Sequence, residues 1–256
     1  MTGTVYLVGA GPGAPDLLTL RAAKLLAEAD IVLHDALVHP DTIALAVRAQ
    51  KIPVGKRCGK HSTAQQFINK RLVDAARRHR VVVRLKGGDP MLFGRAEEEI
   101  AALVAAGIEF EIVPGVTAAL AASAELAIAL TQRGKARSVA FATPRVGAGE
   151  RPSDWARSIA AADTGAIYMG TGQAAAIAEA LLAAGKPAAT PVAVVENASL
   201  PSASVRYTTL AGLPALMQSA SGGPALILLG PQFRARAGGA SATAPRQLPA
   251  RRWATR

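Results

Sequence analysis

The sequence predicts an α/β protein made of two α/β domains, and three observations support this prediction. Short runs of apolar, β-branched residues alternate with alanine- and leucine-rich helical patterns along most of the chain. Loops rich in glycine and proline follow several of the predicted strands, for example at residues 9–16 and 87–90. Half of the 256 residues are hydrophobic, which is enough to build a large core.

In the first half of the chain, the predicted strands cover residues 5–10, 31–33, 51–54, 81–85 and 109–113. The predicted helices cover residues 17–29, 41–49, 62–79 and 95–107. Ser62 and Gln65 have the spacing of a capping box, which favours a helix start at Ser62. Gly107 suits the C-terminal end of the last of these helices.

A very alanine-rich helix, predicted at residues 118–129, begins the second half. Further strands are predicted at 138–142, 166–169, 192–196, 205–209 and 225–229, with a helix at 173–184 and a loop at 144–152. We therefore expect an N-terminal α/β domain over residues 1–116 and a C-terminal α/β domain over residues 117–232.

Residues 233–256 carry six arginines and no acidic residue, and they predict a disordered basic tail. They account for six of the net charge of +11, so residues 1–232 keep a charge of +5, which suits an anionic substrate. The sequence disfavours nucleic acid as a partner, because helix-turn-helix, RNP and zinc-finger patterns are all missing.

Three absences in the sequence limit the class of protein. No run of 18 apolar residues could form a transmembrane helix, and the N-terminus reaches glycine too early for a signal peptide. The single cysteine, Cys58, excludes an internal disulfide and a cysteine zinc site. We expect a cytoplasmic protein that has neither a membrane partner nor a metal.

The most informative stretch covers residues 81–99. A buried strand ends in Gly87-Gly88-Asp89-Pro90, and a helix with three glutamates in its first turn follows Arg95. Glycine lets backbone approach a ligand closely, and open α/β sheets bind ligands where a strand ends before a helix. A tight turn that binds no ligand is the alternative interpretation of this loop taken alone.

A second glycine loop follows the first strand. Gly9, Gly11 and Ala14 match a dinucleotide-binding fingerprint, and Asp30 lies at the distance where that fingerprint has an acidic residue. Pro12 and its neighbour Pro15 remove amide donors that a pyrophosphate needs, which disfavours NAD.

With these motifs in view, the chain closely resembles the uroporphyrinogen-III C-methyltransferases of the tetrapyrrole methylase family. The resemblance extends from residue 5 to about residue 230 and rests on segments that occur in the family's order. These segments are VYLVGAGPGAPDLLTLRAAKLLAEADIVLHDALV, VGKRCGKH, VVRLKGGDPMLFGRAEEE, VPGVTAALAASA, IYMG and TPVAVVENAS.

This resemblance implies two α/β domains with S-adenosyl-L-methionine in the cleft between them, and a homodimer. It also implies that two methyl groups are transferred to uroporphyrinogen III, giving precorrin-2 for sirohaem or cobalamin biosynthesis. An activated sulfonium methyl mainly requires alignment with its acceptor carbon, and a substrate rich in carboxylates requires cations.

The resemblance assigns roles to individual residues. Asp35 falls on the proposed proton acceptor and Lys56 on the proposed proton donor. Positions expected to face the tetrapyrrole are Arg95, Glu98 and Arg133. Positions expected to contact the cofactor are Pro12, Gly87, Gly88, Asp89, Leu92, Thr117, Ala118, Met169 and Ala198.

The chain departs from the usual family pattern mostly on the expected tetrapyrrole side. His34 stands where tyrosine is common, Gln132 replaces a histidine, and residues 125–129 and 143–145 also differ from the pattern. A methyltransferase of the same fold that acts on a later corrin precursor is therefore a second hypothesis. The element at residues 55–61, which such sister enzymes usually lack, favours uroporphyrinogen III.

Overall fold

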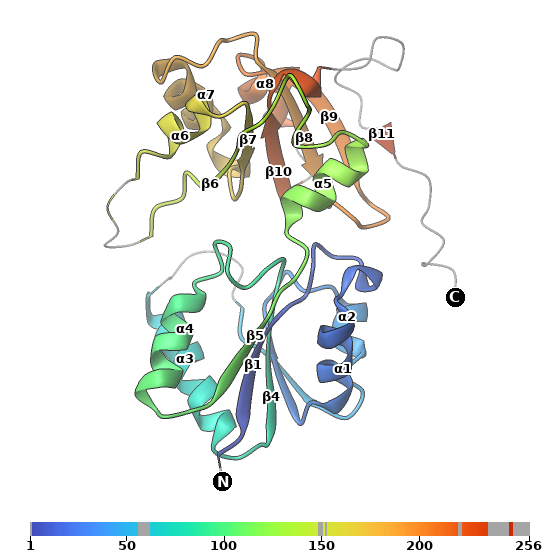
Figure 1. The fold of residues 1–256 in the computed structure, drawn as a ribbon, viewed down its shortest axis with the longest axis vertical. Helices are drawn as coiled ribbons and strands as arrows, with labels where there is room; N and C mark the ends of the chain where they lie inside the picture. The colour runs from blue at the N-terminus through green and yellow to red at the C-terminus, as the bar shows by residue number, and fades with distance from the viewer. Residues whose placement is uncertain are drawn as a thin grey trace. The chain divides into compact units, whose positions relative to one another are not determined.

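The computed structural model describes residues 2–55, 62–147, 151, 153–219, 222–234 and 246–247. The chain divides into two compact units, Met1–Thr117 and Ala118–Arg256, which we call unit 1 and unit 2 (Figure 1). Both units mix helices with one sheet, so the predicted α/β fold is confirmed.

Unit 1 is built on a five-stranded sheet in the order β3-β2-β4-β1-β5. Every pairing in this sheet is parallel. Its strands are β1 (Thr4–Gly9), β2 (Ile31–His34), β3 (Gln50–Pro53), β4 (Val81–Lys86) and β5 (Phe110–Val113). Parallel strands place all their carboxyl ends at one edge, and this edge carries both glycine loops of unit 1.

Helices cover both faces of this sheet (Figure 1). The helical segments of unit 1 are η1 (Pro15–Leu17), α1 (Leu20–Glu28), α2 (Pro40–Ala44), α3 (Ser62–Ala76) and α4 (Ala96–Ala105). Alternate strand residues serve the two faces: Leu33 packs in the core with α3 and α4, whereas Val32 packs with α1. The same alternation turns Val82 toward α3 and α4 and Val83 toward α1.

Unit 2 contains a six-stranded sheet in the order β11-β9-β8-β10-β7-β6. Only the β6–β7 pairing is parallel among those that the structure describes. The strands are β6 (Val139–Ala142), β7 (Thr164–Ile167), β8 (Pro191–Glu196), β9 (Ser204–Thr209), β10 (Ala225–Leu229) and β11 (Arg246–Gln247). The helices are α5 (Ala118–Leu126), α6 (Trp155–Ala161), η2 (Thr171–Gln173), α7 (Ala174–Ala183), α8 (Leu213–Gln218) and η3 (Pro231–Phe233).

Two separate cores lie on the two faces of the unit 2 sheet. One face packs against α6, α7 and α8, with Ile159, Leu181 and Leu213 fully buried. The other face packs against α5 and η3. Phe233 is fully buried there, so the prediction that the tail begins at Phe233 is wrong at that residue. The remainder of the predicted disordered tail falls largely outside the described residues.

Several predicted boundaries differ from the structure. The first helix begins at Leu20 rather than Leu17, because Thr19 caps it by accepting a hydrogen bond from the Ala22 N–H group. The second helix ends at Ala44. Helices α6 and α8 were not predicted, and both are short. Among the described residues, no helix has the length and apolar character needed to cross a membrane.

Candidate active site

The carboxyl edge of the unit 1 sheet is assembled from three backbone segments in direct contact. A Cβ atom added to Gly9 would lie 2.6 Å from the Gly115 Cα atom and 2.8 Å from the Gly88 carbonyl oxygen. These glycines follow or end β1, β4 and β5, so the absence of side chains lets the three loops meet.

Hydrogen bonds hold these loops in place. Gly11 and Gly88 exchange two backbone bonds, with N···O distances of 3.2 and 2.7 Å. Asp89 accepts from the Met91 N–H at 2.8 Å and from the Gly115 N–H at 2.9 Å. Both carboxylate oxygens of Asp89 therefore organise the edge itself.

Gly87 and Gly88 border open space. A Cβ atom at Gly88 would meet no atom within 4 Å, and one at Gly87 would meet only the Leu37 Cβ atom at 3.8 Å. Gly88 has a φ of +68°, a conformation that favours glycine. Pro12 and Leu92, which are half-buried, lie on the same two loops as Gly11 and Gly88. A backbone surface free of side chains is what a closely bound ligand requires.

Asp35 follows β2 at the same edge, and its side chain is 31% exposed. Its Oδ1 atom accepts a hydrogen bond from Arg84 Nη2 at 2.5 Å, and the Arg84 side chain is almost fully buried. An aspartate that only capped the following turn would not make this contact with Arg84. In the turn, the Val38 N–H group donates to the Asp35 main-chain carbonyl instead.

Arg95 and Glu98 pair with each other at the start of α4. Arg95 Nε donates to Glu98 Oε1 at 2.6 Å, and Arg95 Nη2 donates to Glu98 Oε2 at 2.8 Å. Their side chains are 41% and 47% exposed. Glu98 thus occupies the Nε–Nη2 edge of the guanidinium, and both side chains are partly accessible from solvent.

In unit 2, three of the predicted cofactor residues are linked through α5. Ala118 begins this helix, and the next N–H group, that of Ala119, donates to the Tyr168 hydroxyl at 3.1 Å beside Met169. Further along α5, Glu125 accepts from the Ser199 N–H group at 3.0 Å, next to Ala198. Met169 is 42% exposed and has a φ of +55°.

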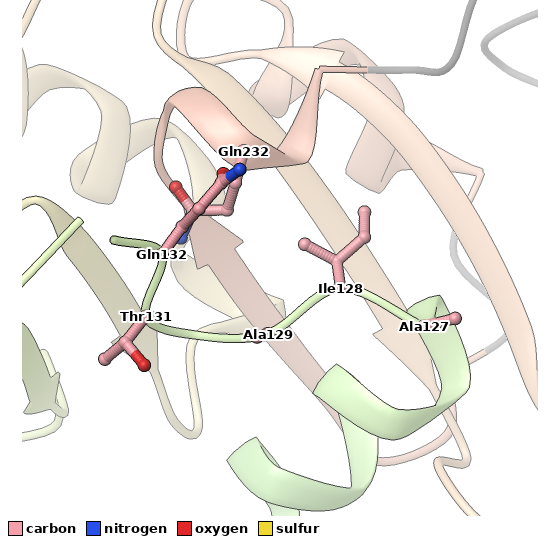
Figure 2. Close-up of a pocket in the computed structure, with 6 residues that line it drawn as sticks. All are labelled: Ala127, Ile128, Ala129, Thr131, Gln132 and Gln232. Carbon is pink, nitrogen blue, oxygen red and sulfur yellow. The ribbon is translucent and has the colours of Figure 1, made fainter. Parts of the chain in front are cut away.

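A pocket of about 350 Å³ lies in unit 2 where the chain leaves α5. Figure 2 shows that most of its lining comes from one irregular segment, with Gln232 contributed by η3. The lining residues are Ala127, Ile128, Ala129, Thr131, Gln132 and Gln232. Gln132 and residues 127–129 of this lining are positions at which the chain departs from the family pattern. The exposed Arg133 follows Gln132 directly in the sequence.

The dinucleotide interpretation fails on geometry. The Asp30 carboxylate accepts from the Arg80 N–H at 3.0 Å and from the Val81 N–H at 2.8 Å, at the amino ends of the strands. It therefore lies at the sheet edge opposite the glycine loops. The Gly11 N–H, which a pyrophosphate would need, is bonded to Gly88.

The model for the tetrapyrrole (corrin/porphyrin) methylases matches residues 4–214. The chain belongs to the tetrapyrrole methylase family. This confirms the family predicted from the sequence motifs.

Individual relatives of this chain narrow the comparison. Siroheme synthase from Azotobacter vinelandii is 45% identical over 236 residues, which cover 91% of this chain and 51% of that protein. This chain thus spans about half the length of the curated relatives it matches.

Among solved structures, uroporphyrin-III C-methyl transferase from Thermus thermophilus is 41% identical. The match covers 90% of this chain and 98% of that chain. The TM-score is 0.79 for the native form and 0.77 for the complex with S-adenosyl homocysteine. A cobalt precorrin-4 methyltransferase is 31% identical, with a TM-score of 0.77 and coverage of 90% and 96% of the two chains.

The structure brings together some of the predicted residues within each unit. Asp35 and the Gly87–Gly88 loop share one sheet edge, whereas Arg95 and Glu98 follow that loop at the start of α4. Thr117 ends unit 1 and Arg133 lies in unit 2. Lys56, the predicted proton donor, lies outside the described residues. No cluster of side chains suited to a metal occurs among the residues described.

In unit 1, three buried charged residues were not predicted from the sequence, namely Arg84, Lys86 and Glu99. The signal was present in the spacing. Arg84 lies between apolar residues inside the strand predicted at 81–85, and Lys86 directly follows that strand, where charges need buried partners.

Proposed function

We propose that this methylase transfers methyl groups from S-adenosyl-L-methionine to uroporphyrinogen III, giving precorrin-2 in sirohaem or cobalamin biosynthesis. The observation that carries the proposal is the side-chain-free surface at Gly87 and Gly88, on the same sheet edge as the Asp35 carboxylate. The 41% identity to a uroporphyrin-III C-methyl transferase, which has also been solved with S-adenosyl homocysteine, supports the choice of substrate and methyl donor.

The residues present fit this cofactor, because open space begins directly at the backbone of Gly87 and Gly88. When bound, S-adenosyl-L-methionine supplies a methyl group on a positively charged sulfur, which leaves as the sulfide of S-adenosyl homocysteine. The unit 1 contacts would come from Pro12, Gly87, Gly88, Asp89, Leu92 and Thr117. Those of unit 2 would come from Ala118, Met169 and Ala198.

The remaining residues would act on the substrate. Arg84 holds Oδ1 of Asp35, so Oδ2 can accept the proton that the substrate loses after methylation. Lys56 is proposed to return a proton. Arg95 and Arg133 would bind the acetate and propionate groups of the tetrapyrrole, and Glu98, which orients Arg95 through its Nε and Nη2 atoms, would face the same substrate.

The alternative substrate is a later corrin precursor. A cobalt precorrin-4 methyltransferase has a similar fold but a lower identity of 31%. The element at residues 55–61, which favours uroporphyrinogen III, falls mostly outside the described residues. The homodimer, implied by the resemblance, and the cytoplasmic location, expected from the sequence, stay predictions. Analytical ultracentrifugation tests the homodimer.

The deciding experiment is an anaerobic reaction of the purified chain with uroporphyrinogen III and the methyl donor. Mass spectrometry and the absorption spectrum should show a product with two added methyl groups and two equivalents of S-adenosyl homocysteine. Turnover of a later corrin precursor, with none of uroporphyrinogen III, would overturn the proposed substrate.

A matched glycine variant tests the cofactor surface. Gly87→Val adds a side chain where the protein has room, and Gly87 lacks the positive φ that makes Gly88→Val a strained substitution. We expect a melting temperature near that of the wild type and a loss of S-adenosyl homocysteine binding in calorimetry. Wild-type affinity in Gly87→Val would remove this loop from the site.

A further inference from the structure

Glu99 is a fully buried carboxylate with three side-chain donors around it. Arg84 Nε donates to Oε1 at 2.9 Å, and Lys86 Nζ donates to Oε2 at 2.8 Å. The Gln65 Nε2 atom lies 3.4 Å from Oε1 and also donates to Asn69 Oδ1 at 3.0 Å. The relative exposure of Glu99 is 0%, against 2% for both Arg84 and Lys86.

The local structure explains this arrangement. Residues at alternate positions of β4 face the same side, so Arg84 and Lys86 lie on the face that Val82 turns toward α3 and α4. Glu99 is the fourth residue of α4 and points inward, whereas Glu97 and Glu98 are exposed. The sequence pattern of three consecutive glutamates therefore contains one residue with a different task.

From Glu99, one branch of contacts leads to the reacting side of the site. Arg84 binds Glu99 with its Nε atom and Asp35 with its Nη2 atom. It also donates to the main-chain oxygens of Leu33 at 3.4 Å and Leu85 at 3.2 Å. One planar guanidinium thus fixes the position of the Asp35 carboxylate relative to β2, β4 and α4.

The other branch leads to the cofactor loop. Lys86 directly precedes Gly87, and its ion pair with Glu99 joins the last residue of β4 to α4. These two residues bracket the loop 87–95. A Cβ atom at Gly94 would lie 3.2 Å from Lys86 Cε, so the loop packs on the lysine stem. The buried ion pair between Lys86 and Glu99 therefore holds both ends of the loop 87–95.

Stability alone does not account for such a cluster. Taking charges out of water is costly, and well-packed hydrocarbon at the same positions is often as stable or more stable. Burial lowers the pKa of Lys86, and the nearby Arg84 lowers it further, whereas Glu99 opposes both effects. For Arg84, burial also lowers the pKa, but Asp35 and Glu99 outweigh it and keep the pKa above its usual value.

We propose that Glu99 is a positioning residue that holds Arg84 and Lys86 so that Asp35 and the Gly87–Gly88 loop keep one fixed arrangement. Glu99 itself touches neither cofactor nor substrate in this proposal. The inference rests on the proposed function for the role of Asp35, whereas the part concerning the loop requires only cofactor binding.

The main test is Glu99→Gln in the full chain, which keeps the size of the side chain but removes its charge. We expect S-adenosyl homocysteine to bind about tenfold more weakly and kcat to fall about 10²-fold, the scale of a misplaced catalytic group. In the double variant Glu99→Gln/Asp35→Ala, kcat should be no lower than in Asp35→Ala alone, because both changes remove the same interaction.

The matched control is Glu196→Gln, which neutralises a buried carboxylate paired with Arg206 in unit 2. It should lower the melting temperature and leave both kcat and cofactor affinity unchanged. A Glu99→Gln variant that behaves like this control would overturn the proposal. A kcat loss that multiplies with that of Asp35→Ala would do the same.

A second variant keeps the test decisive if Glu99→Gln does not fold. Arg84→Lys preserves the positive charge beside Glu99, but a single ammonium cannot span both Glu99 and Asp35. We expect a lower kcat with unchanged cofactor affinity, and a wild-type kcat would disprove the Asp35 branch. If the wild-type chain does not methylate uroporphyrinogen III, the proposed function fails, while the calorimetric arm still decides the loop branch.

Discussion

Both units bury an arginine paired with a glutamate, but only in unit 1 do the described contacts of the arginine reach a partly exposed carboxylate. In unit 2, Arg206 Nη2 donates to Glu196 Oε2 at 3.0 Å, and Nη1 donates to the Leu216 carbonyl at 2.9 Å near the end of α8. Both side chains of this pair are 4% exposed. In unit 1, Arg84 and Glu99 are as deeply buried, yet the chain of contacts continues to Asp35, which is 31% exposed.

The difference teaches how buried charge can serve two purposes. The unit 2 pair joins neighbouring antiparallel strands and the end of a helix, so the contacts described for it are structural. The unit 1 cluster lies below the carboxyl edge of a parallel sheet, where open α/β sheets bind ligands. The same type of ion pair therefore stabilises packing in one unit and orients a functional group in the other.

The largest effect on activity should come from the exposed end of the unit 1 cluster. Asp35→Asn and Asp35→Ala should both slow single-turnover methylation by roughly 10²–10⁴-fold, because neither side chain accepts a proton. Thermal melts of both variants separate this loss from instability. An Asn variant with full activity would end the catalytic role of Asp35.

Replacing charge by hydrocarbon should distinguish the two clusters in stability. Arg206→Met alone leaves Glu196 buried without its partner and should cost about 3–5 kcal/mol, whereas Arg206→Met/Glu196→Leu should recover most of the loss. The equivalent Arg84→Met/Glu99→Leu should not recover, because Lys86 and Asp35 lose their partners. Urea unfolding measures both differences, and equal recovery in the two units would contradict the comparison.

A smaller effect is expected for the exposed arginines of the two units. Arg95→Ala and Arg133→Ala should each cost roughly 1.5–3 kcal/mol of tetrapyrrole binding, the value of a charge-assisted bond. The KM for uroporphyrinogen III should rise while calorimetry gives wild-type cofactor affinity. Lysine at either position should rescue only in part, since its ammonium is not a planar fork. Normal turnover at low substrate concentration would show that the arginine in question does not contact the substrate.

The smallest effect concerns two aspartates, one in each unit, that bond backbone at strand starts. The Val81 N–H, followed by that of Arg80, lowers the pKa of Asp30 below the usual 3.8. The Arg137 N–H, together with Ser138, does the same for Asp163. A lowered folded-state pKa gives stability that is present above the unfolded-state value and lost as pH falls through the folded-state value.

Asp30→Asn and Asp163→Asn should therefore lower the melting temperature slightly at pH 7. Below pH 4, the melting temperature of each variant should decrease less steeply with falling pH than that of the wild type. The exposed Glu179→Gln in α7 is the control for removing one carboxylate. An unchanged acid limb in both aspartate variants would show that these hydrogen bonds do not contribute.

Much of the fold was predictable because its signals are local. The β-branched runs that became β1, β4 and β8 are short and apolar, and Gly87-Gly88 cannot continue a strand. The predicted helix at 118–129 ended early because Ala127 adopts a φ of +51°. A non-glycine residue at a positive φ is held there by tertiary contacts, which one sequence does not reveal.

The site was predictable where the backbone determines it, and it was not predictable where side chains from different strands and helices contact each other. The glycine loops follow from steric arguments on the sequence alone. The contact of Asp35 with Arg84 joins residues from β4 and the end of β2, and Glu99 appeared only as one of three acids at a helix start. Roles assigned by resemblance, including that of Lys56, stay predictions.

The close approach of Gly9, Gly88 and Gly115 has a consequence for how the chain acquires its structure. The first and last of these glycines are about a hundred residues apart in the sequence, so their contact requires the slow, long-range pairing of β5 with β1. A growing polypeptide cannot assemble this edge until β5 has been synthesised. The ability to bind a ligand there should therefore arise late, after most of the parallel sheet has already formed.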